Sequence, residues 1–248
     1  MPPPGVTSVM IPGGATRLPR PHMPATEKSV APGRIVRYCE NMRYPVTRFE
    51  SLEVCLKELE PFIRDGQHLE TGKPFKRFGG LRSRELLANF LLCVALNSAT
   101  HADRLTFFSD PLGGDGVIYD TVTEETWPTE HILVPRNGGV RSEAIPLEAR
   151  ILKAIESKQS KGGAAYASGK TLLVFLNAGE SEPWFPNKVA KQLPALDFSA
   201  VWVVGLQTFE AGEYVYNVVR LDLHQGDVPV WRVRIRKGFD AWRVEPVQ

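Results

Sequence analysis

The chain has 248 residues, 43% of them hydrophobic, and its 30 basic residues nearly balance its 28 acidic ones. This composition excludes collagen, a coiled coil and wholesale disorder, and it leaves enough apolar side chains for a sizeable core. A net charge of +2 is too small to indicate nucleic-acid binding by itself.

The cysteines and the apolar runs predict the compartment. Cys39, Cys55 and Cys93 are odd in number and widely spaced, so the sequence predicts neither a disulfide framework nor a zinc site and favours a reducing, cytoplasmic setting. No apolar run approaches the roughly 20 residues that span a bilayer. The N-terminus lacks a signal sequence, so we expect neither a membrane partner nor export.

Residues 1–34 contain eight prolines and four glycines but no aromatic residue. Such a segment buries too little apolar surface to offset the entropy of ordering, which predicts a disordered tail. Residues 35–248 then form a single α/β domain, since their number fits one domain comfortably.

The apolar periodicity within that domain predicts helices and strands in alternation. An amphipathic helix is expected over 50–63, and Ser83 is expected to N-cap a helix that is apolar nearly all round. Short strands follow at 105–108, 117–119 and 132–134, then a helix at 147–161 and a buried strand at 171–176. Beyond this αβββαβ order, the sequence predicts a short helix at 187–193 and further strands at 200–206, 214–221 and 230–236 that extend the sheet.

Six acidic residues and no basic residue lie between positions 110 and 130. Asp115, flanked by glycines, heads one predicted strand, and Glu130 begins the next strand after a hairpin. Adjacent antiparallel strands bring both carboxylates to one edge of the sheet, where two oxygen ligands suit Mg²⁺. A solvated hairpin that binds nothing is the alternative explanation of the same acidic run.

The order αβββαβ, with Gly-Gly-Asp115-Gly-Val-Ile on the second strand and Glu130 on the third, resembles the PD-(D/E)xK nuclease superfamily. The resemblance covers roughly residues 81–176 and implies a restriction-endonuclease-like core, a DNA substrate and bound Mg²⁺ or Mn²⁺. It also implies that Asp115 and Glu130 are the metal ligands. The superfamily places a lysine two residues after the glutamate, but residue 132 is isoleucine here, so the lysine is either lost or supplied from elsewhere.

The helix at 147–161 offers a replacement. Helical geometry places Gln159 on its buried face and Lys158 beside that face, whereas Lys153 points almost oppositely. Some branches of the superfamily carry the lysine and a glutamine on this helix, so the resemblance assigns these roles to Lys158 and Gln159. A surface lysine lying along the helix flank remains the alternative. Glu85 resembles an additional acidic site residue of some members, or it complements the helix dipole.

Two other features bear on function. Strand alternation points His131 away from Glu130, which predicts a packed histidine rather than a catalytic one. The Gly169-Lys170-Thr171 segment resembles the end of a phosphate-binding loop, but it lacks the first glycine and precedes a strand instead of a helix. We therefore expect no nucleotide cofactor.

Two basic stretches could contact a nucleic-acid backbone. The first lies before the buried helix and contains Lys73, Lys76, Arg77, Arg82 and Arg84. In the second, Arg232, Arg234 and Arg236 alternate with apolar residues, which also fits a charged edge strand that resists aggregation.

Together these features predict a metal-dependent phosphodiesterase acting on DNA, either an endonuclease or an exonuclease, with a homodimer left open. The catalytic set is Asp115, Glu130, Lys158, Gln159 and Glu85. The alternative is a catalytically inactive protein of the same fold that binds nucleic acid or protein. The isoleucine at position 132 favours this alternative.

Overall fold

The computed structural model describes residues 51–66, 74–136, 145–177, 182–223 and 227–248, and all of them belong to one compact unit spanning residues 37–248. The predicted tail at 1–34 and the basic residue Lys73 lie outside the described residues.

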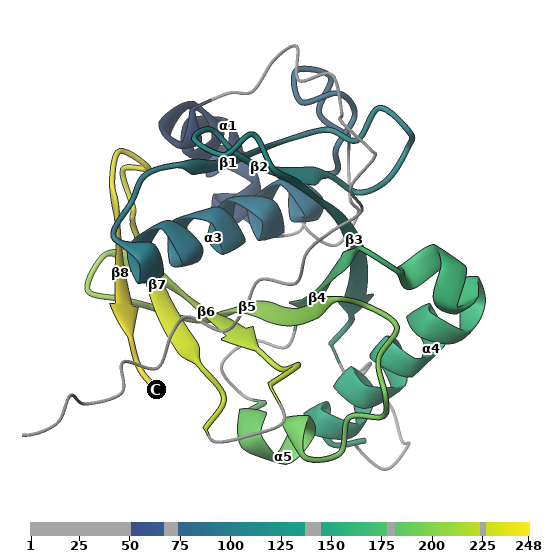
Figure 1. Cartoon of the computed structure of the whole chain (residues 1–248). Coiled ribbons are helices and arrows are strands. Elements are labelled where there is room, and N and C mark those ends of the chain that lie inside the picture. Colours follow the sequence, from purple (N-terminus) through teal and green to yellow (C-terminus); the bar gives the residue numbers. More distant parts are fainter. Residues whose placement is uncertain (1–50, 67–73, 137–144, 178–181, 224–226) are drawn as a thin grey trace, which may run out of the picture. The chain divides into compact units, whose positions relative to one another are not determined.

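In these ranges the structure contains one mixed sheet of 8 strands and helices on both of its faces (Figure 1). The helices are α1 (Leu52–Asp65), α3 (Ser83–Thr100), α4 (Leu147–Ala167) and α5 (Pro186–Ala190). The strands are β1 (Leu105–Phe108), β2 (Val117–Asp120), β3 (Thr126–Val134), β4 (Thr171–Leu176), β5 (Ala200–Glu210), β6 (Glu213–Arg220), β7 (Val230–Arg236) and β8 (Trp242–Pro246).

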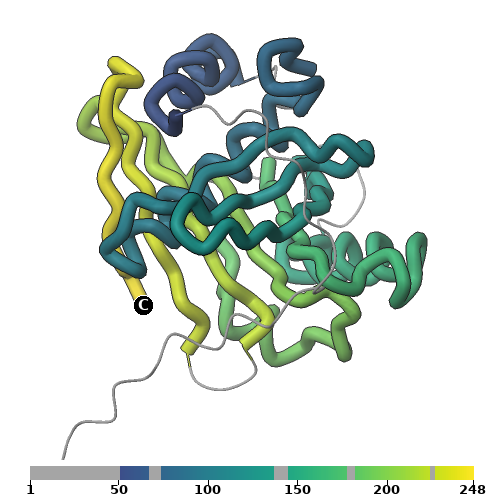
Figure 2. The backbone as a smooth tube through the Cα atoms, turned by 45° about the horizontal axis from the view of Figure 1, so that its top comes forward, coloured from purple at the N-terminus to yellow at the C-terminus, as the bar shows by residue number. Residues whose placement is uncertain are grey.

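The strands lie in the sheet in the same order as in the sequence. Strands β1 to β3 form an antiparallel meander, β3, β4 and β5 are parallel to one another, and β5 to β8 are again antiparallel. The parallel pairs need crossover connections, which α4 and α5 provide. In Figure 2, the yellow strands β7 and β8 lie on one side of the domain and the green helix α4 lies on the other.

The fold class predicted from the sequence, a restriction-endonuclease-like αβββαβ core with additional C-terminal strands, is wrong. The C-terminal strands are no addition to a smaller core, because β5 pairs directly with β4 and the last four strands make up half of one continuous, curled sheet (Figure 1). Within the described residues, eight strands of a single sheet stand against four helices, which is not the predicted αβββαβ core.

Helix α3 explains the curl. It is apolar nearly all round, and its residues from Leu86 to Ala95 are buried, so it needs apolar partners on every side. Side chains of β6 and β7, including Tyr216, Val233 and Ile235, share its core together with α1. A sheet that curls around α3 covers the apolar residues of the helix on more than one side.

A second core lies on the opposite face of the sheet, beneath α4 and α5. Ile151 and Ile155 of α4 are fully buried there against Leu172, Val174 and neighbouring strand residues. Apolar side chains therefore cover both faces of β4, which accounts for its unbroken hydrophobic sequence. Within the described residues, no helix is both long enough and apolar enough to cross a bilayer.

Three local predictions need correction. Ser83 is the first residue of α3 rather than its cap, since Arg82 stands at the N-cap. Strand β3 begins at residue 126, six positions before the predicted start. The prediction started too late because a proline, here Pro128, argues against a strand. The short strand β8 was not predicted, and it pairs with β7 at the end of the sheet.

Candidate active site

The candidate site lies where β2 and β3 meet α4 and the turn into β4. Asp115 stands two residues before β2, and Glu130 is in β3 with its side chain only 7% exposed. Lys158 and Tyr166 come from α4, and Lys170 directly precedes β4. We call these five side chains the carboxylate–lysine cluster.

Asn89, a fully buried side chain on α3, fixes the backbone at Asp115. Its Nδ2 donates to the Asp115 carbonyl over 3.1 Å, and its Oδ1 accepts from the Thr129 hydroxyl over 3.0 Å. Gly116 has a φ of 139°, and a Cβ at this position would lie 2.4 Å from Asn89 Nδ2. Glycine is therefore needed here, and the turn before β2 is fastened to both α3 and β3.

The Asp115 carboxylate reaches across to β3. Its Oδ2 accepts a hydrogen bond of 2.7 Å from the His131 amide and lies 3.9 Å from Lys158 Nζ. Burial raises the pKa of Asp115, and the negative charge of Glu130 adds to this rise. The His131 amide and the Lys158 ammonium oppose it without cancelling it, so the pKa of Asp115 stays above its ordinary value.

Glu130 is held from three sides. Its Oε1 accepts from Lys170 Nζ over 2.7 Å, and its Oε2 accepts from the Tyr166 hydroxyl and lies 3.0 Å from Lys158 Nζ. Burial alone would raise the pKa of Glu130, but the hydrogen bonds from Lys170, Tyr166 and Lys158 outweigh it and lower the pKa. The two carboxylates of the cluster thus have pKa values displaced in opposite directions.

Lys158 is the side chain that both carboxylates share, and it is 18% exposed. Burial lowers the pKa of an ammonium group, but the Tyr166 hydroxyl and the charges of Glu130 and Asp115 raise the pKa of Lys158 above its ordinary value. Lys158 is therefore protonated at neutral pH and supplies a fixed positive charge. Ile132, which stands where the superfamily has its lysine, packs against the second core and carries no charge.

A glycine kink near the end of α4 brings Tyr166 to the cluster. Gly163 has φ 63° and ψ −176°, which interrupts the helix. A Cβ on Gly162 would lie 2.1 Å from the Tyr166 ring, so the ring packs directly against the glycine backbone. Lys158 precedes the kink and Tyr166 follows it, and both reach Glu130 because the helix is broken between them.

No family model, curated protein or solved structure matches this chain. Its function therefore has to be inferred from the chemistry of these side chains.

Glu85 lies beside the cluster and also caps α3. Its Oε2 accepts from the Arg82 amide over 2.8 Å. Burial raises the pKa of Glu85, and the Asp115 charge raises it further despite the opposing Arg82 amide. Glu85 is thus close enough to Asp115 for their charges to interact, and its hydrogen bond from the Arg82 amide places it at the N-terminus of α3.

Gln159 is engaged away from the carboxylates. Its Nε2 donates to the Ala195 carbonyl over 3.0 Å, and its Oε1 accepts from the Asp197 amide over 3.3 Å. The side chain fastens the segment before β5 to α4, so the structure does not bring it together with the other four predicted catalytic residues.

His131 is buried, and within the described residues neither ring nitrogen has a hydrogen-bond partner. Burial lowers the pKa of His131 to about 3, with smaller contributions from the Lys158 and Arg84 charges. The imidazole is therefore neutral at physiological pH. Its backbone amide, rather than its ring, serves the site by binding Asp115.

The first basic stretch is divided between two locations. Arg77 pairs with Glu58 of α1 at 2.6 Å, and Lys76 is exposed on the same loop. Arg82 and Arg84 lie at the start of α3, and their charges act on Glu85. Of the four residues of this stretch that the structure describes, these two arginines stand next to the candidate site.

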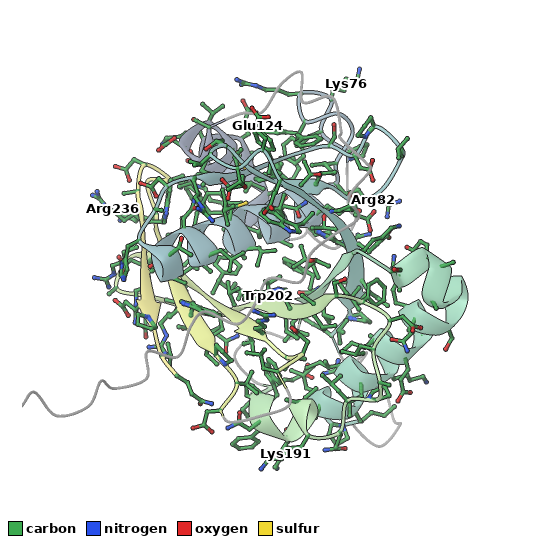
Figure 3. The ribbon with its side chains drawn as sticks, viewed as in Figure 1. Lys76, Arg82, Glu124, Lys191, Trp202 and Arg236 are labelled. Atoms are coloured by element: carbon green, nitrogen blue, oxygen red, sulfur yellow. The ribbon has the colours of Figure 1, made fainter. Side chains whose placement is uncertain are left out.

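The second basic stretch lies on β7, four strands away from β3 in the sheet. Figure 3 shows Arg236 and Arg82 at opposite sides of the molecule. Arg234 forms ion pairs with three acids, one each from β5, β6 and β8, and Arg236 pairs with Asp240 at 3.6 Å. The edge-strand explanation is wrong, since β7 is paired on both sides and β8 is the edge.

Sequence reasoning missed three side chains of the site. Asn89 is the single amide that interrupts the apolar stretch from Leu86 to Leu96, and this isolation was the signal for a buried polar role. Tyr166 gave no signal, because its approach depends on the kink. Lys170 was noticed only as part of a failed nucleotide-binding motif.

Proposed function

We propose that this protein is a metal-dependent phosphodiesterase acting on DNA, in which Asp115 and Glu130 bind Mg²⁺ or Mn²⁺ and Lys158 assists the reaction. The observation that carries the proposal is the Lys158 ammonium, which lies 3.0 Å from Glu130 and 3.9 Å from Asp115. Phosphodiester cleavage needs ligands for a divalent ion and a cation for the phosphate, and this arrangement combines the two.

The donor set fits Mg²⁺ or Mn²⁺ rather than zinc. Within the described parts of the chain, no group of three or more His, Cys, Asp or Glu side chains gathers at one place. Zinc sites need three or four such ligands, whereas Mg²⁺ is usually held by one or two carboxylates together with water and substrate phosphate. Among the described residues, Glu130 Oε1 accepts one hydrogen bond, from Lys170 Nζ, and a carboxylate oxygen can accept two.

When bound, the divalent ion activates water and neutralises charge on the phosphodiester. Lys158 remains protonated and donates hydrogen bonds to the attacking water or to a phosphate oxygen. The His131 amide holds Asp115 in position over 2.7 Å, and Asn89 fixes the backbone beneath it. The chain thus supplies a preorganised pair of ligands and a fixed cation.

Arg82 and Arg84 support DNA as the substrate. Both stand at the start of α3 beside Glu85, and Arg82 also lies close enough to Asp115 to act on its charge. Arginines next to a phosphodiester site contact the phosphates that flank the cleaved bond. We assign them this positioning role.

The decisive experiment is cleavage of supercoiled plasmid and linear duplex DNA in the presence of Mg²⁺ or Mn²⁺. Asp115→Ala and Glu130→Ala should each reduce the cleavage rate by at least about 10²-fold, because each removes a ligand and a preorganised charge. The matched control is Glu125→Ala, which removes an exposed carboxylate from the same acidic run and should leave the rate unchanged.

The proposal fails if the wild type does not cleave DNA with either metal. It also fails if the wild type cleaves and both Asp115→Ala and Glu130→Ala retain its rate.

A second candidate function is a non-catalytic DNA-binding module. The observation that favours it is the coverage of Glu130, whose two oxygens are already engaged by two ammonium groups and a tyrosine hydroxyl. Such a module would bind DNA with a strong dependence on salt and would not cleave it. Salt-dependent binding without cleavage in either metal would favour this second function over the first.

A further inference from the structure

Lys170 is held on a rigid part of the backbone. It follows Gly169, which has a φ of 79°, and stands one residue before β4. Its amide donates to the Ala167 carbonyl over 3.0 Å, and its carbonyl accepts from the Ser199 amide over 2.9 Å. The base of this side chain is thereby fixed to α4 on one side and to the start of β5 on the other.

Lys170 is also the outermost cation of the carboxylate–lysine cluster. Its side chain is 27% exposed, compared with 18% for Lys158 and 7% for Glu130. The ammonium lies 2.7 Å from Glu130 Oε1 and 4.1 Å from the centre of the Tyr166 ring. It therefore stands between the buried carboxylate and solvent, and the ring restricts where it can move.

Charge balance gives Lys170 a second partner. The carboxylates of Asp115 and Glu130 carry two negative charges, and the ammonium groups of Lys158 and Lys170 carry two positive charges. A divalent ion on the carboxylates, as the proposed function requires, leaves both ammonium groups without a compensating charge. A phosphate of the DNA backbone supplies one of the two missing negative charges, and the more exposed ammonium can reach it first.

We propose that Lys170 is a phosphate-binding residue of this site, which lies on Glu130 in the free protein and contacts a backbone phosphate when metal and DNA are bound. This inference rests on the proposed function for the metal, but not on DNA cleavage. It gives Lys170 a role distinct from that of Lys158, which stays between the two carboxylates.

The test is the salt dependence of duplex DNA binding, measured by fluorescence anisotropy with Ca²⁺ and again with EDTA. Each phosphate contact contributes about −0.9 to the slope of log K against log salt concentration. With Ca²⁺, Lys170→Met should make the slope less negative by about 0.9 and weaken binding. With EDTA, where Lys170 remains on Glu130, the slopes of wild type and variant should be equal.

Lys153→Met is the matched control, because Lys153 is an exposed lysine of α4 and should leave both slopes unchanged. Lys170→Gln keeps a hydrogen-bond donor for Glu130 without the charge. With Ca²⁺ it should show a slope less negative by about 0.9 even if Lys170→Met is poorly folded. Equal slopes for wild type and Lys170→Gln with Ca²⁺ would overturn the proposal, as would absence of DNA binding by the wild type.

These outcomes are distinct from those of the cleavage assay. A wild type that binds DNA without cleaving it, and loses slope in Lys170→Gln, refutes the phosphodiesterase and retains the Lys170 contact. A wild type that cleaves DNA with an unchanged slope in Lys170→Gln does the reverse.

Discussion

The carboxylate–lysine cluster and the arginines of β7 are two collections of paired charges that differ in burial. On β7, the Arg234 side chain is 14% exposed, but two of its three acidic partners, Glu210 and Glu245, are 52% and 44% exposed. In the cluster, Glu130 is 7% exposed and its partner Lys158 is 18% exposed. Exposed pairs are screened by water and contribute little, whereas buried ones shift pKa values and mark functional sites.

The comparison teaches that a row of like charges in the sequence says little until its partners are known. Alternating arginines were compatible with a cationic ridge, yet Arg234 at the centre of the row is paired with acids of β5, β6 and β8. The acidic run predicted a carboxylate pair, and two lysines from a distant segment complete it. Function is therefore expected in the second region and structural support in the first.

The largest effect should come from Lys158→Met, which removes the ammonium shared by both carboxylates. We expect the rate of metal-dependent DNA cleavage to fall by about 10²- to 10³-fold, the usual cost of losing one preorganised electrostatic group. The rate is measured under single-turnover conditions. Lys153→Met on the same helix should cleave at the wild-type rate, and equal loss in both variants would contradict a specific role for Lys158.

The next effect should come from Asn89→Ala, which removes the amide beneath Asp115. The Asp115 carbonyl and the Thr129 hydroxyl lose their partner in a buried place, which costs about 1–3 kcal/mol in the free energy of unfolding. Urea denaturation measures this loss. A variant as stable as the wild type would show that the turn before β2 does not depend on Asn89.

Neutralising the two carboxylates of the cluster should change the free energy of unfolding in opposite directions. The folded-state pKa of Asp115 is raised, so its charge disfavours folding at neutral pH and Asp115→Asn should stabilise the protein. The folded-state pKa of Glu130 is lowered, so its charge favours folding above the ordinary glutamate value of 4.5, and Glu130→Gln should destabilise the protein.

The pH dependence sharpens this contrast. The stability that Glu130 contributes is present above its unfolded-state pKa and is lost as the pH falls through the lower folded-state value. The penalty from Asp115 shrinks as the pH falls toward its raised folded-state pKa. Thermal unfolding at pH 7 and at successively lower pH measures both differences. Shifts of the same sign in both variants at pH 7 would contradict the assignment.

The smallest effect should come from Arg236→Ala on β7. This arginine and its partner Asp240 are 63% and 52% exposed, so loss of the pair should change the free energy of unfolding by less than about 1 kcal/mol. DNA affinity and its salt slope should stay at the wild-type values. A loss of slope comparable to that of Lys170→Gln would show that β7 contacts DNA and would contradict a purely structural role for its arginines.

The sequence predicted most of the individual helices and strands but not their assembly. Periodicity located α3 and β4 because burial fixes their apolar patterns. It also predicted that strands after β4 extend the sheet, but it did not reveal β8 or the curl of the sheet around α3, since strand pairing is a contact between distant segments. The uniform apolar surface of α3 was the available sign that more than four strands would be needed to cover it.

The site was predictable where the hairpin and the helix period fixed its geometry. Asp115 lies just before β2 and Glu130 lies on the adjacent strand β3, and Lys158 lies beside the buried face of α4. Tyr166 could not be placed because Gly163 breaks the period on which helical placement rests. Gln159 was misplaced for a different reason. Its predicted position on the buried face of the helix gave no information about its partners, the carbonyl of residue 195 and the amide of residue 197.

The central claim, that Asp115 and Glu130 form a divalent metal site, is tested most directly by calorimetric titration of Mn²⁺ into the wild type and Asp115→Asn. This variant is suitable because it is expected to be more stable than the wild type, so a loss of binding cannot be attributed to unfolding. The account predicts saturable Mn²⁺ binding to the wild type and none to Asp115→Asn. Absence of binding to the wild type, or equal binding to both proteins, would contradict it.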